Sequence, residues 1–470
     1  MLGLFNTLNL GSRSLAAQQL GAEVTGQNLA NVDNTAYARQ RVVLQTSTPL
    51  QTGIGQEGTG VVAVAIQQIR DALLDGQIQT QGSVSGSLSA QQKALQDAEV
   101  ALGEQVSSTS TSGNSSSPNG LLQKLTDFFN SLQSLSSDPS SLTQRQAVIA
   151  AAQDLATQFN QVDSQLSAMH VNLSTAVQTD VTSANQDLSD IATLNQQIIA
   201  SQMRGGTAND LIDLREQKLE DLSSKVQFTA TTQADGGVDI TIGGVTMVSG
   251  VSQPDSLEAY DAGGGRLLVR AQTAGTDLTL TGGSIEGEIT ARDGAVANLQ
   301  LRLNGYAQQL MAEVNNIYTT GYDLNGNGGQ PFFNGGSSSD MAVNPGLVND
   351  PSTFQASGTS GAAGDNSIVL ALAQLANQGI NGQLQGQTFT AGYSRIVAGL
   401  GQTISSINDQ VASSNAVTSM LSNQRASVSG VSLDEEMTNL MQFQKAYQAS
   451  AQLISTINEM LQTVIAMKGS

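Results

Sequence analysis

The sequence of 470 residues contains no cysteine, no tryptophan and a single histidine, His170. Without cysteine the chain cannot form disulfides, thiolate metal sites or a cysteine nucleophile. One histidine cannot supply a two-histidine metal site, and a Ser-His-Asp triad would have to use His170, which lies in a polar stretch and is expected on a helix surface. We therefore expect no catalytic residue, no cofactor and no metal site.

Charged residues are scarce as well, at 12% of the chain, which is half the usual fraction of about 25%. Acidic residues outnumber basic ones by 39 to 19, and the resulting net charge of -20 opposes binding to nucleic acid or to anionic membranes. The polar remainder is Gln, Asn, Ser, Thr and Gly, which suits a surface that packs against copies of itself. Aromatic residues make up only 4% of the chain, which argues against an enzyme with an aromatic-lined pocket.

Long hydrophobic runs are also missing. The longest, Val61 to Ile66 and Ile368 to Ala373, have six residues, whereas a bilayer-spanning helix needs roughly 20. The first twenty residues carry one charge, Arg13, which follows the apolar start instead of preceding it, so no secretory signal peptide is expected. The protein is expected either to stay in the cytoplasm or to be exported without a cleaved signal.

Both ends of the chain have the apolar spacing of packed helices. Alternating steps of four and three from Leu4 to Val32 predict a helix that packs on another helix, although Gly and Gln at its core positions weaken the seam. The same spacing from Leu433 to Ile465 is accompanied by a second stripe from Phe443 to Val464. Two seams on one helix indicate two contacts, one to the N-terminal helix and one to a neighbouring subunit. The alternative is that both stripes form the ordinary core of a large helical domain.

The middle of the chain changes period. Helical spacing after Pro139 continues to about Val226, a period of two follows from Val226 to Ile289, and helical spacing returns from Val296 to Ile317. Ser- and Gly-rich stretches at 107–120 and 335–364 are expected to be flexible loops.

The sequence thus predicts a mainly α fold: long helical bundle or coiled-coil axial domains formed by paired N- and C-terminal segments, with an inserted small antiparallel β-domain. The expected domains are residues 1–75 with 405–470 as an axial helical core, residues 76–226 with 290–404 as a helical rod-like middle domain, and residues 227–289 as the β-domain.

Two patterns carry possible chemistry. Asp323, Asn325, Asn327 and Gly328 match the start of a calcium loop, but Asn334 stands where such a loop needs a bidentate glutamate, so a structural Asx/Gly turn is favoured over weak calcium binding.

Glu286 and Glu288 would share one face of a predicted strand. A solvated face is favoured over a glycosidase-like acid pair, because nothing in the sequence indicates a pocket.

Two terminal segments resemble a known family. NLANVDNTAYARQRV (Asn28 to Val42) is similar to the N-terminal signature of bacterial flagellar rod, hook and hook-associated proteins, with Ala36 where that family usually has glycine. The continuation from Tyr37 to Gln40 resembles the hook-associated branch. Residues Ser427 to Ile465 resemble the C-terminal axial helix of the same proteins.

Internal segments narrow the resemblance to the hook-associated protein 1 family, whose members form the first hook–filament junction. ANDLIDLREQKLEDLSSKV (Ala208 to Val226) resembles a family helix, with Glu216 in place of aspartate. GGSIEGEITARD (Gly282 to Asp293) resembles a strand-to-helix junction. Residues Val314 to Phe333 match a further family pattern except that Tyr318 replaces histidine, and the G-D-N triplet at 364–366 is another landmark.

The resemblance implies an extracellular structural subunit of the flagellum, exported without a cleaved signal peptide and arranged as a homo-oligomeric ring between hook and filament. It implies hook subunits, the second hook–filament junction protein and an export chaperone as partners. Another flagellar axial protein, such as a hook or flagellin-like subunit, and an enzymatic surface domain built on the β-insertion remain alternatives. The residues predicted for the assembly interface are Leu4, Leu8, Leu15, Leu29, Val32, Tyr37, Leu433, Met437, Leu440, Tyr447, Ile454, Leu461 and Ile465.

Overall fold

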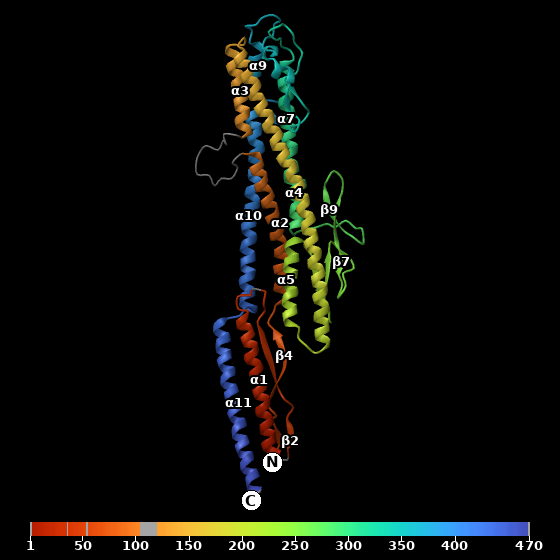
Figure 1. Cartoon of the computed structure of the whole chain (residues 1–470), viewed down its shortest axis with the longest axis vertical. Coiled ribbons are helices and arrows are strands. Elements are labelled where there is room, and N and C mark those ends of the chain that lie inside the picture. The colour runs from red at the N-terminus through yellow and green to blue at the C-terminus, as the bar shows by residue number, and fades with distance from the viewer. Residues whose placement is uncertain (1, 35, 53–54, 104–119, 469–470) are drawn as a thin grey trace.

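The computed structural model describes residues 2–34, 36–52, 55–103 and 120–468. Figure 1 shows an elongated molecule in which long helices run along one axis, with small β units at their sides. The molecule is mainly helical with a few small antiparallel sheets, which confirms the predicted fold class. None of the helices in the described ranges combines the length and apolar character that crossing a bilayer requires.

Long helices account for most of the chain. In order they are α1 (Leu2–Ala30), α2 (Ala72–Leu102), α3 (Leu121–Ser137), α4 (Leu142–Met203), α5 (Asn209–Lys225), α6 (Ser284–Thr290), the π-helix η1 (Ala291–Val296), α7 (Ala297–Tyr318), α8 (Pro345–Asn349), α9 (Ser367–Gln374), α10 (Phe389–Ser429) and α11 (Leu433–Lys468), with short 3-10 turns at Pro351–Thr353 and Gly382–Leu384.

The strands are short and pair only in antiparallel fashion. They are β1 (Gln40–Thr46), β2 (Leu50–Thr52), β3 (Gly55–Glu57), β4 (Val61–Gln68), β5 (Thr229–Thr232), β6 (Val238–Ile242), β7 (Val245–Val248), β8 (Leu257–Asp261), β9 (Leu267–Ala271), β10 (Phe333–Asn334) and β11 (Ala342–Val343).

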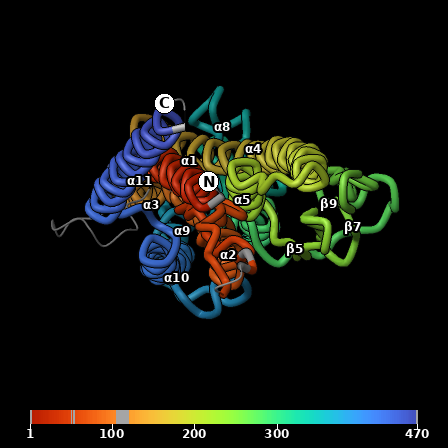
Figure 2. Tube along the Cα trace, turned by 90° about the horizontal axis from the view of Figure 1, so that it is seen from below, coloured from red at the N-terminus to blue at the C-terminus, as the bar shows by residue number. Residues whose placement is uncertain are grey.

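The two ends of the chain lie together. Helices α1 and α11 pack side by side at one end of the molecule, where both termini lie (Figure 1), and the view from below in Figure 2 shows the same pairing. Strands β1 and β4 form a long hairpin against α1, with Gln40 opposite Gln68 and Thr46 opposite Val61. Sequence analysis did not predict this hairpin, although it noted the apolar run that becomes β4.

Helices α2, α4, α5, α7 and α10 form the rod, with α3 and α9 at its far end (Figure 1). Helix α4 is a single helix of 62 residues, which corresponds to a length of about 93 Å. The core at the far end gathers most of the few aromatic side chains, which pack ring against ring. They are Phe128, Phe129, Phe159, Tyr306, Tyr318, Phe332, Phe333, Phe354, Phe389 and Tyr393. The scarce aromatics are therefore used for packing in one place.

The predicted β-insertion is present but shorter than expected. It consists of a three-stranded sheet in the order β5-β6-β7 and the hairpin β8-β9, which pack on the rod. The expectation that strands continue to Ile289 was wrong, because α6 begins at Ser284 and carries Glu286 and Glu288. Ile285 and Ile289 are four residues apart, a spacing that fits one face of a strand and one face of a helix equally well.

The expected flexible loop at 335–364 contains ordered structure. Strand β11 and helix α8 lie within it, Asp340 accepts hydrogen bonds from the backbone N–H groups of Gly336 and Ser337, and Asn160 of α4 donates to the Ser338 carbonyl at 2.8 Å. This expectation was wrong because Ser, Asp and Asn side chains satisfy the backbone there. The other expected loop, 107–120, lies outside the described residues except for its last residue.

The proposed division into axial, middle and β-domains stays a prediction. Helices α2 and α10 run without interruption through its expected limits at 75/76 and 404/405.

Candidate functional site, the terminal helix pair and its polar joint

Two glycines of α1 set the close packing of the terminal helix pair. A Cβ atom at Gly11 would lie 2.9 Å from Cγ1 of Ile454, and one at Gly21 would lie 2.5 Å from Cε1 of Phe443. Only a residue without a side chain fits these distances. The glycines that seemed to weaken the seam are therefore the points where α11 approaches α1 most closely.

One face of α11 meets α1 and another is left uncovered. Ile457 and Ser450 are buried, and the Ser14 and Ser450 hydroxyls share a hydrogen bond of 2.9 Å. On both flanks of that contact, large apolar side chains are exposed over the whole length of the helix. They are Leu433, Met437, Met441, Tyr447, Leu453, Met460, Val464, Ile465 and Met467. This exposed apolar surface of α11, called the α11 outer face below, is long enough to pack against further helices.

The residues predicted for assembly fall into three groups. Leu4, Leu8, Leu15, Leu29, Val32, Leu440, Ile454 and Leu461 are partly buried along the helix pair; Leu433, Met437, Tyr447 and Ile465 are exposed on the α11 outer face; and Tyr37 is buried inside the subunit. Tyr37 is thus enclosed by its own chain. For all of these residues, a role in assembly stays a prediction.

Asn28, at the end of α1, is the centre of a buried hydrogen-bond network. Its Nδ2 donates to the Gln40 carbonyl at 2.8 Å and to Oε2 of Glu436 at 3.0 Å. Its Oδ1 accepts from the Gln40 backbone N–H and from the Tyr37 hydroxyl, both at 2.9 Å. One amide therefore connects α1, the segment before β1, and α11.

Arg39 fixes the start of α11. Its guanidinium forms ion pairs of 2.7 Å with Glu435 and with Glu436, and Glu436 is only 2% exposed. Its backbone N–H donates to the Ser429 carbonyl at the end of α10 at 2.9 Å. The break between α10 and α11 is therefore tied to the N-terminal segment.

Arg70, between β4 and α2, ties the N-terminal segment to the rod. It pairs with Asp75 of α2 at 3.2 Å and with Asp213 and Glu216 of α5 at 2.9 and 3.6 Å. Its Nη2 also donates to the Ala36 carbonyl at 3.3 Å. The longer Glu216 side chain, which replaces the family's usual aspartate, thus lies within reach of the arginine.

The start of α5 completes the connection. Asn209 donates to Oε1 of Gln40 and to the Ile66 carbonyl, both at 3.0 Å, and Asp210 accepts from Gln40 and Gln27. We call the whole network the polar joint. Its members are Asn28, Tyr37, Arg39, Gln40, Arg70, Asp75, Asn209, Asp210, Asp213, Glu216, Glu435 and Glu436.

Burial makes the joint sensitive to charge. Desolvation raises the pKa of Asp213 to about 6, against the lowering effect of Arg70, and it raises the pKa values of Asp75 and Glu216 as well. For Arg70, burial acts to lower the pKa, but the three surrounding carboxylates raise it above the usual value. The arginine is thus the charge that keeps three partly buried acids compatible with one another.

The joint unites segments that are far apart in the sequence. Three segments meet in it: the N-terminal motif, the helix at 208–226 and the start of α11. Their motifs therefore have a structural role, which is to hold these segments together. Ala36, where the family usually has glycine, has an ordinary backbone: the non-glycine residues with positive φ in the described ranges are Ala208 and Gln385. Arg70 and Asp75 were missed, since neither belongs to a recognisable pattern.

The Asp323 loop and His170 are two further chemical candidates. Oδ1 of Asp323 accepts from the backbone N–H groups of Asn325 and Asn327, both at 2.8 Å, which is the Asx turn that was favoured over calcium binding. Within the described ranges, no group of three or more His, Asp or Glu side chains is placed to hold a metal. His170 is half-buried on α4, and burial, followed by the nearby Arg292, lowers its pKa.

Glu286 and Glu288 do not form an acid pair. They are two residues apart on α6, which places them about 200° apart around the helix. Glu286 accepts from the hydroxyls of Ser87 and Thr290, at 2.5 and 2.6 Å, whereas Glu288 lines a groove between α2 and α4. The interpretation as a shared face was therefore wrong.

Comparison with family models gives two matches. Residues 113–333 match the model of the flagellar hook-associated protein FlgK helical domain, and residues 422–467 match that of the C-terminal region of the flagellar basal body rod FlgEFG proteins. The second match covers the end of α10 and nearly all of α11.

Comparison with individual proteins agrees. The chain is 28% identical to flagellar hook-associated protein 1 of Bacillus subtilis, over 99% of this chain and 98% of that protein, and 24% identical to the Escherichia coli protein of the same name, over 98% and 99%. Its fold is similar to that of the flagellar hook junction protein FlgK from Burkholderia pseudomallei, with a TM-score of 0.65 and 16% identity, covering 75% of this chain and all of that one. The helical-domain match and the similarity over nearly the whole chain show that this chain resembles the flagellar hook-associated protein 1 family.

Proposed function

We propose that the protein is a structural subunit of the bacterial flagellum that forms the junction between hook and filament and assembles through its terminal helices. The observation that carries the proposal is the α11 outer face, the exposed Leu, Met, Tyr, Val and Ile side chains that flank the contact between α11 and α1. An isolated subunit leaves this surface in water, and packing it against neighbouring helix pairs removes it.

The polar joint gives the assembled subunit its mechanical role. Ion pairs and buried hydrogen bonds tie the terminal pair to the rod at Arg39 and Arg70, so that force on the terminal helices passes to α2, α5 and α10. A polar network of this kind fixes the orientation of the terminal helix pair relative to the rod, because its hydrogen bonds are lost when the two parts rotate. The role is structural and involves no catalytic step.

We propose the finer assignments on the strength of the family. Copies of the chain form a ring, one side of which meets hook subunits and the other the second junction protein, and an export chaperone covers the terminal helices before assembly. The α11 outer face is the surface in this chain that such a chaperone would protect from aggregation.

Deletion of the gene tests the proposal. We expect cells with hooks of normal length and no filaments, and flagellin released into the medium, because export continues while filament growth has no base. Electron microscopy of the cell surface and an immunoblot of the medium measure both. Absent hooks would place the protein in the rod or hook class instead, and intact filaments would contradict a required junction role.

A further inference from the structure

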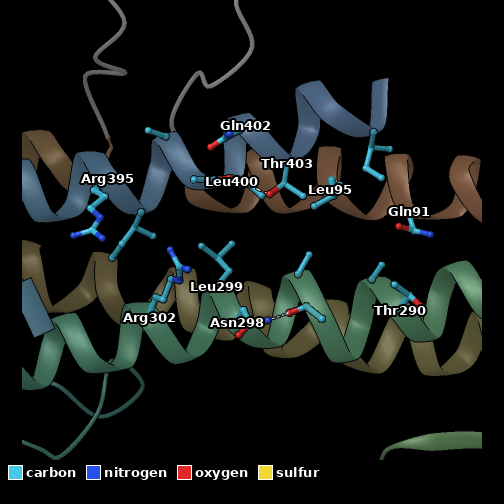
Figure 3. Close-up of a pocket in the computed structure, with 17 residues that line it drawn as sticks. Gln91, Leu95, Thr290, Asn298, Leu299, Arg302, Arg395, Leu400, Gln402 and Thr403 are labelled. Atoms are coloured by element: carbon cyan, nitrogen blue, oxygen red, sulfur yellow. Dashed lines mark hydrogen bonds between the residues drawn. The ribbon is translucent and has the colours of Figure 1, made fainter. Parts of the chain in front are cut away.

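A groove runs along the rod where α2, η1, α7 and α10 meet (Figure 3). It encloses about 800 Å³, and Leu95, Leu299 and Leu400 give it an apolar lining. Arg302 of α7 and Arg395 of α10 stand on its two walls, and Figure 3 shows both side chains directed into the space between the two helices. No carboxylate is among its lining residues in the described chain. We call it the arginine groove.

The two arginines lack acidic partners within the described ranges. Arg302 makes no hydrogen bond or ion pair there, and a Cβ atom at Gly399 of α10 would lie 3.6 Å from its Nη1, so its guanidinium reaches across the groove. Arg395, one turn before Gly399, donates to the neutral Oε1 of Gln385 at 2.7 Å. Two cations thus point into one space without an opposite charge, and a carboxylate is the group that offsets their repulsion.

The start of α11 combines a free carboxylate with exposed apolar side chains. Among the helices of the described ranges, α11 is the one whose first turn holds three acids, Asp434, Glu435 and Glu436. Arg39 pairs with Glu435 and Glu436, whereas Asp434 is exposed and has no side-chain hydrogen bond or ion pair in the described chain. The apolar side chains beside it are 41–57% exposed: Leu433, Met437 and Met441.

Asp434 and these three apolar side chains lie on one side of the helix. At about 100° per residue they fall within about 100° of one another, and Glu436, which is buried in the polar joint, lies about 200° from Asp434. The first basic residue of α11, Lys445, follows about 16 Å further along the helix. Residues 433–441, called the α11 start below, therefore present a free carboxylate beside an apolar strip.

The α11 start is accessible to another molecule but cannot reach the groove of its own chain. Figures 1 and 2 both show α11 at the outer edge of the molecule, beside α1. Helix α10 is continuous, and about 40 Å of it separates Gln402 at the groove from Ser429, whose carbonyl accepts from the Arg39 N–H at the beginning of α11. An α11 start that occupies the groove therefore belongs to another copy.

We propose that the α11 start of one copy of this chain occupies the arginine groove of a second copy. The inference rests on the proposed function and deepens it, since it names the surface that covers the beginning of the α11 outer face. Asp434 then lies between Arg302 and Arg395, and Leu433 and Met437 lie on the apolar lining. Because the groove is about 40 Å along the rod from the α11 start of its own chain, the two copies are shifted along the long axis by about that distance.

A photoreactive residue at the groove tests the contact. Gln402, at the exposed rim of the groove, is replaced by p-benzoylphenylalanine, and isolated flagella that carry this variant are irradiated. Adducts are separated on a denaturing gel and mapped by mass spectrometry after digestion with trypsin. We expect a dimer of this chain in which position 402 is joined to the peptide from Ala426 to Lys445, which contains the α11 start.

The same photoreactive residue at Met203 is the matched control. Met203 is 83% exposed but lies at the end of α4, so irradiation should give no adduct with the peptide from Ala426 to Lys445. For position 402, an adduct with any other part of this chain, an adduct with a different protein, or no adduct would each overturn the contact.

An exchange of charges shows whether the arginines and Asp434 meet. Arg302→Glu with Arg395→Glu, and Asp434→Arg alone, should each lower the yield of the adduct by roughly tenfold, because like charges then face one another. Combining the three substitutions should restore most of the yield, since opposite charges again meet. Lys at both arginine positions should retain most of it. Unchanged yield in the Glu variant, or no recovery in the combined variant, would overturn the contact.

Failure of the proposed function is recognised separately, as absence of the unmodified protein from isolated flagella. In that case the same irradiation is carried out on the concentrated purified protein, where absence of the adduct again overturns the contact.

Discussion

Phe443 of α11 packs on Gly21 of α1 so closely that a Cβ atom at position 21 would lie 2.5 Å from the ring. At Gly26, further along the same helix, nothing lies within 4 Å of such an atom. The same substitution is therefore expected to have opposite effects at these two positions.

Gly21→Ala should weaken the terminal helix pair by about 1–3 kcal/mol, because the ring of Phe443 must move to admit the methyl group. Gly26→Ala should strengthen it by up to about 1 kcal/mol, because alanine favours helix over glycine and meets no neighbour. Hydrogen exchange of the α11 amides measures both effects. Equal protection in the two variants would contradict the packing described here.

The Asn28 amide should be worth more than the Tyr37 hydroxyl that donates to it. Tyr37→Phe removes one donor to an oxygen that still accepts from the Gln40 N–H, so we expect a loss of about 0.5–1.5 kcal/mol. Asn28→Ala leaves the Gln40 carbonyl, the Gln40 N–H and Oε2 of Glu436 without the Asn28 amide and should cost about 1–3 kcal/mol or more. Urea unfolding of both variants gives the comparison, and a larger loss for Tyr37→Phe would refute this ranking.

Removing Arg39 should destabilise the start of α11, because a buried carboxylate loses its cationic partner. Arg39→Met leaves Glu436, which is 2% exposed, with Asn28 as its remaining side-chain partner, and we expect destabilisation of about 3 kcal/mol. Adding Glu436→Gln should recover part of the lost stability. Hydrogen exchange in the first turns of α11 reports on the effect. A double variant less stable than Arg39→Met would argue against an unpaired buried charge as its cause.

Glu288 should make stability depend on pH. Its pKa is raised from 4.5 to about 8 in the folded chain, chiefly by burial, so the folded state holds this proton more tightly than the unfolded state. The group's contribution therefore falls as pH rises from about 4.5 to about 8. Glu288→Gln removes that contribution, and the variant should gain stability relative to the unmodified protein across this window. Urea midpoints measured over the range test this, and a constant difference would contradict it.

Deletion of residues 433–470 should leave a subunit with a folded rod that cannot enter the flagellum. In the structure α11 packs on α1 and on the joint residues Asn28 and Arg39, whereas the rod has its own core. Circular dichroism of the purified variant and an immunoblot of isolated flagella check the two halves of the expectation. Normal incorporation would exclude α11 as the assembly helix.

Local patterns in the sequence were sufficient to predict the elements whose apolar spacing is regular. The two terminal helices, the helix after Pro139 and the strand β6 with Val238, Ile240 and Ile242 follow from spacing alone, because each carries its apolar residues at the regular period of its own structure. The spacing failed at Ile285 and Ile289, where helix and strand bury the same two residues, and at 335–364, where hydrogen bonds from short polar side chains order a segment with few apolar residues.

The candidate site also has a part that the sequence predicted and a part that it did not. Motif resemblance indicated Tyr37, Asn28 and the helix from Asn209, but not that they meet, since their contacts with Gln40 and Arg70 span up to 170 residues. It also could not assign faces, because each stripe mixes contact and exposure: Ile454 of the first and Phe443 of the second contact α1, whereas Met437 and Met460 are exposed.

The sequence by itself determined the chemistry that is excluded, the helical class and the terminal helices that pair, because composition and periodicity are local properties of the chain. Only the tertiary structure decided which residues of the two α11 stripes stay exposed, which acids Arg70 and Arg39 neutralise, and that Glu288 lies in a groove between α2 and α4. Those outcomes depend on how distant segments pack, since a side chain's burial and charge partners are set by its neighbours in space.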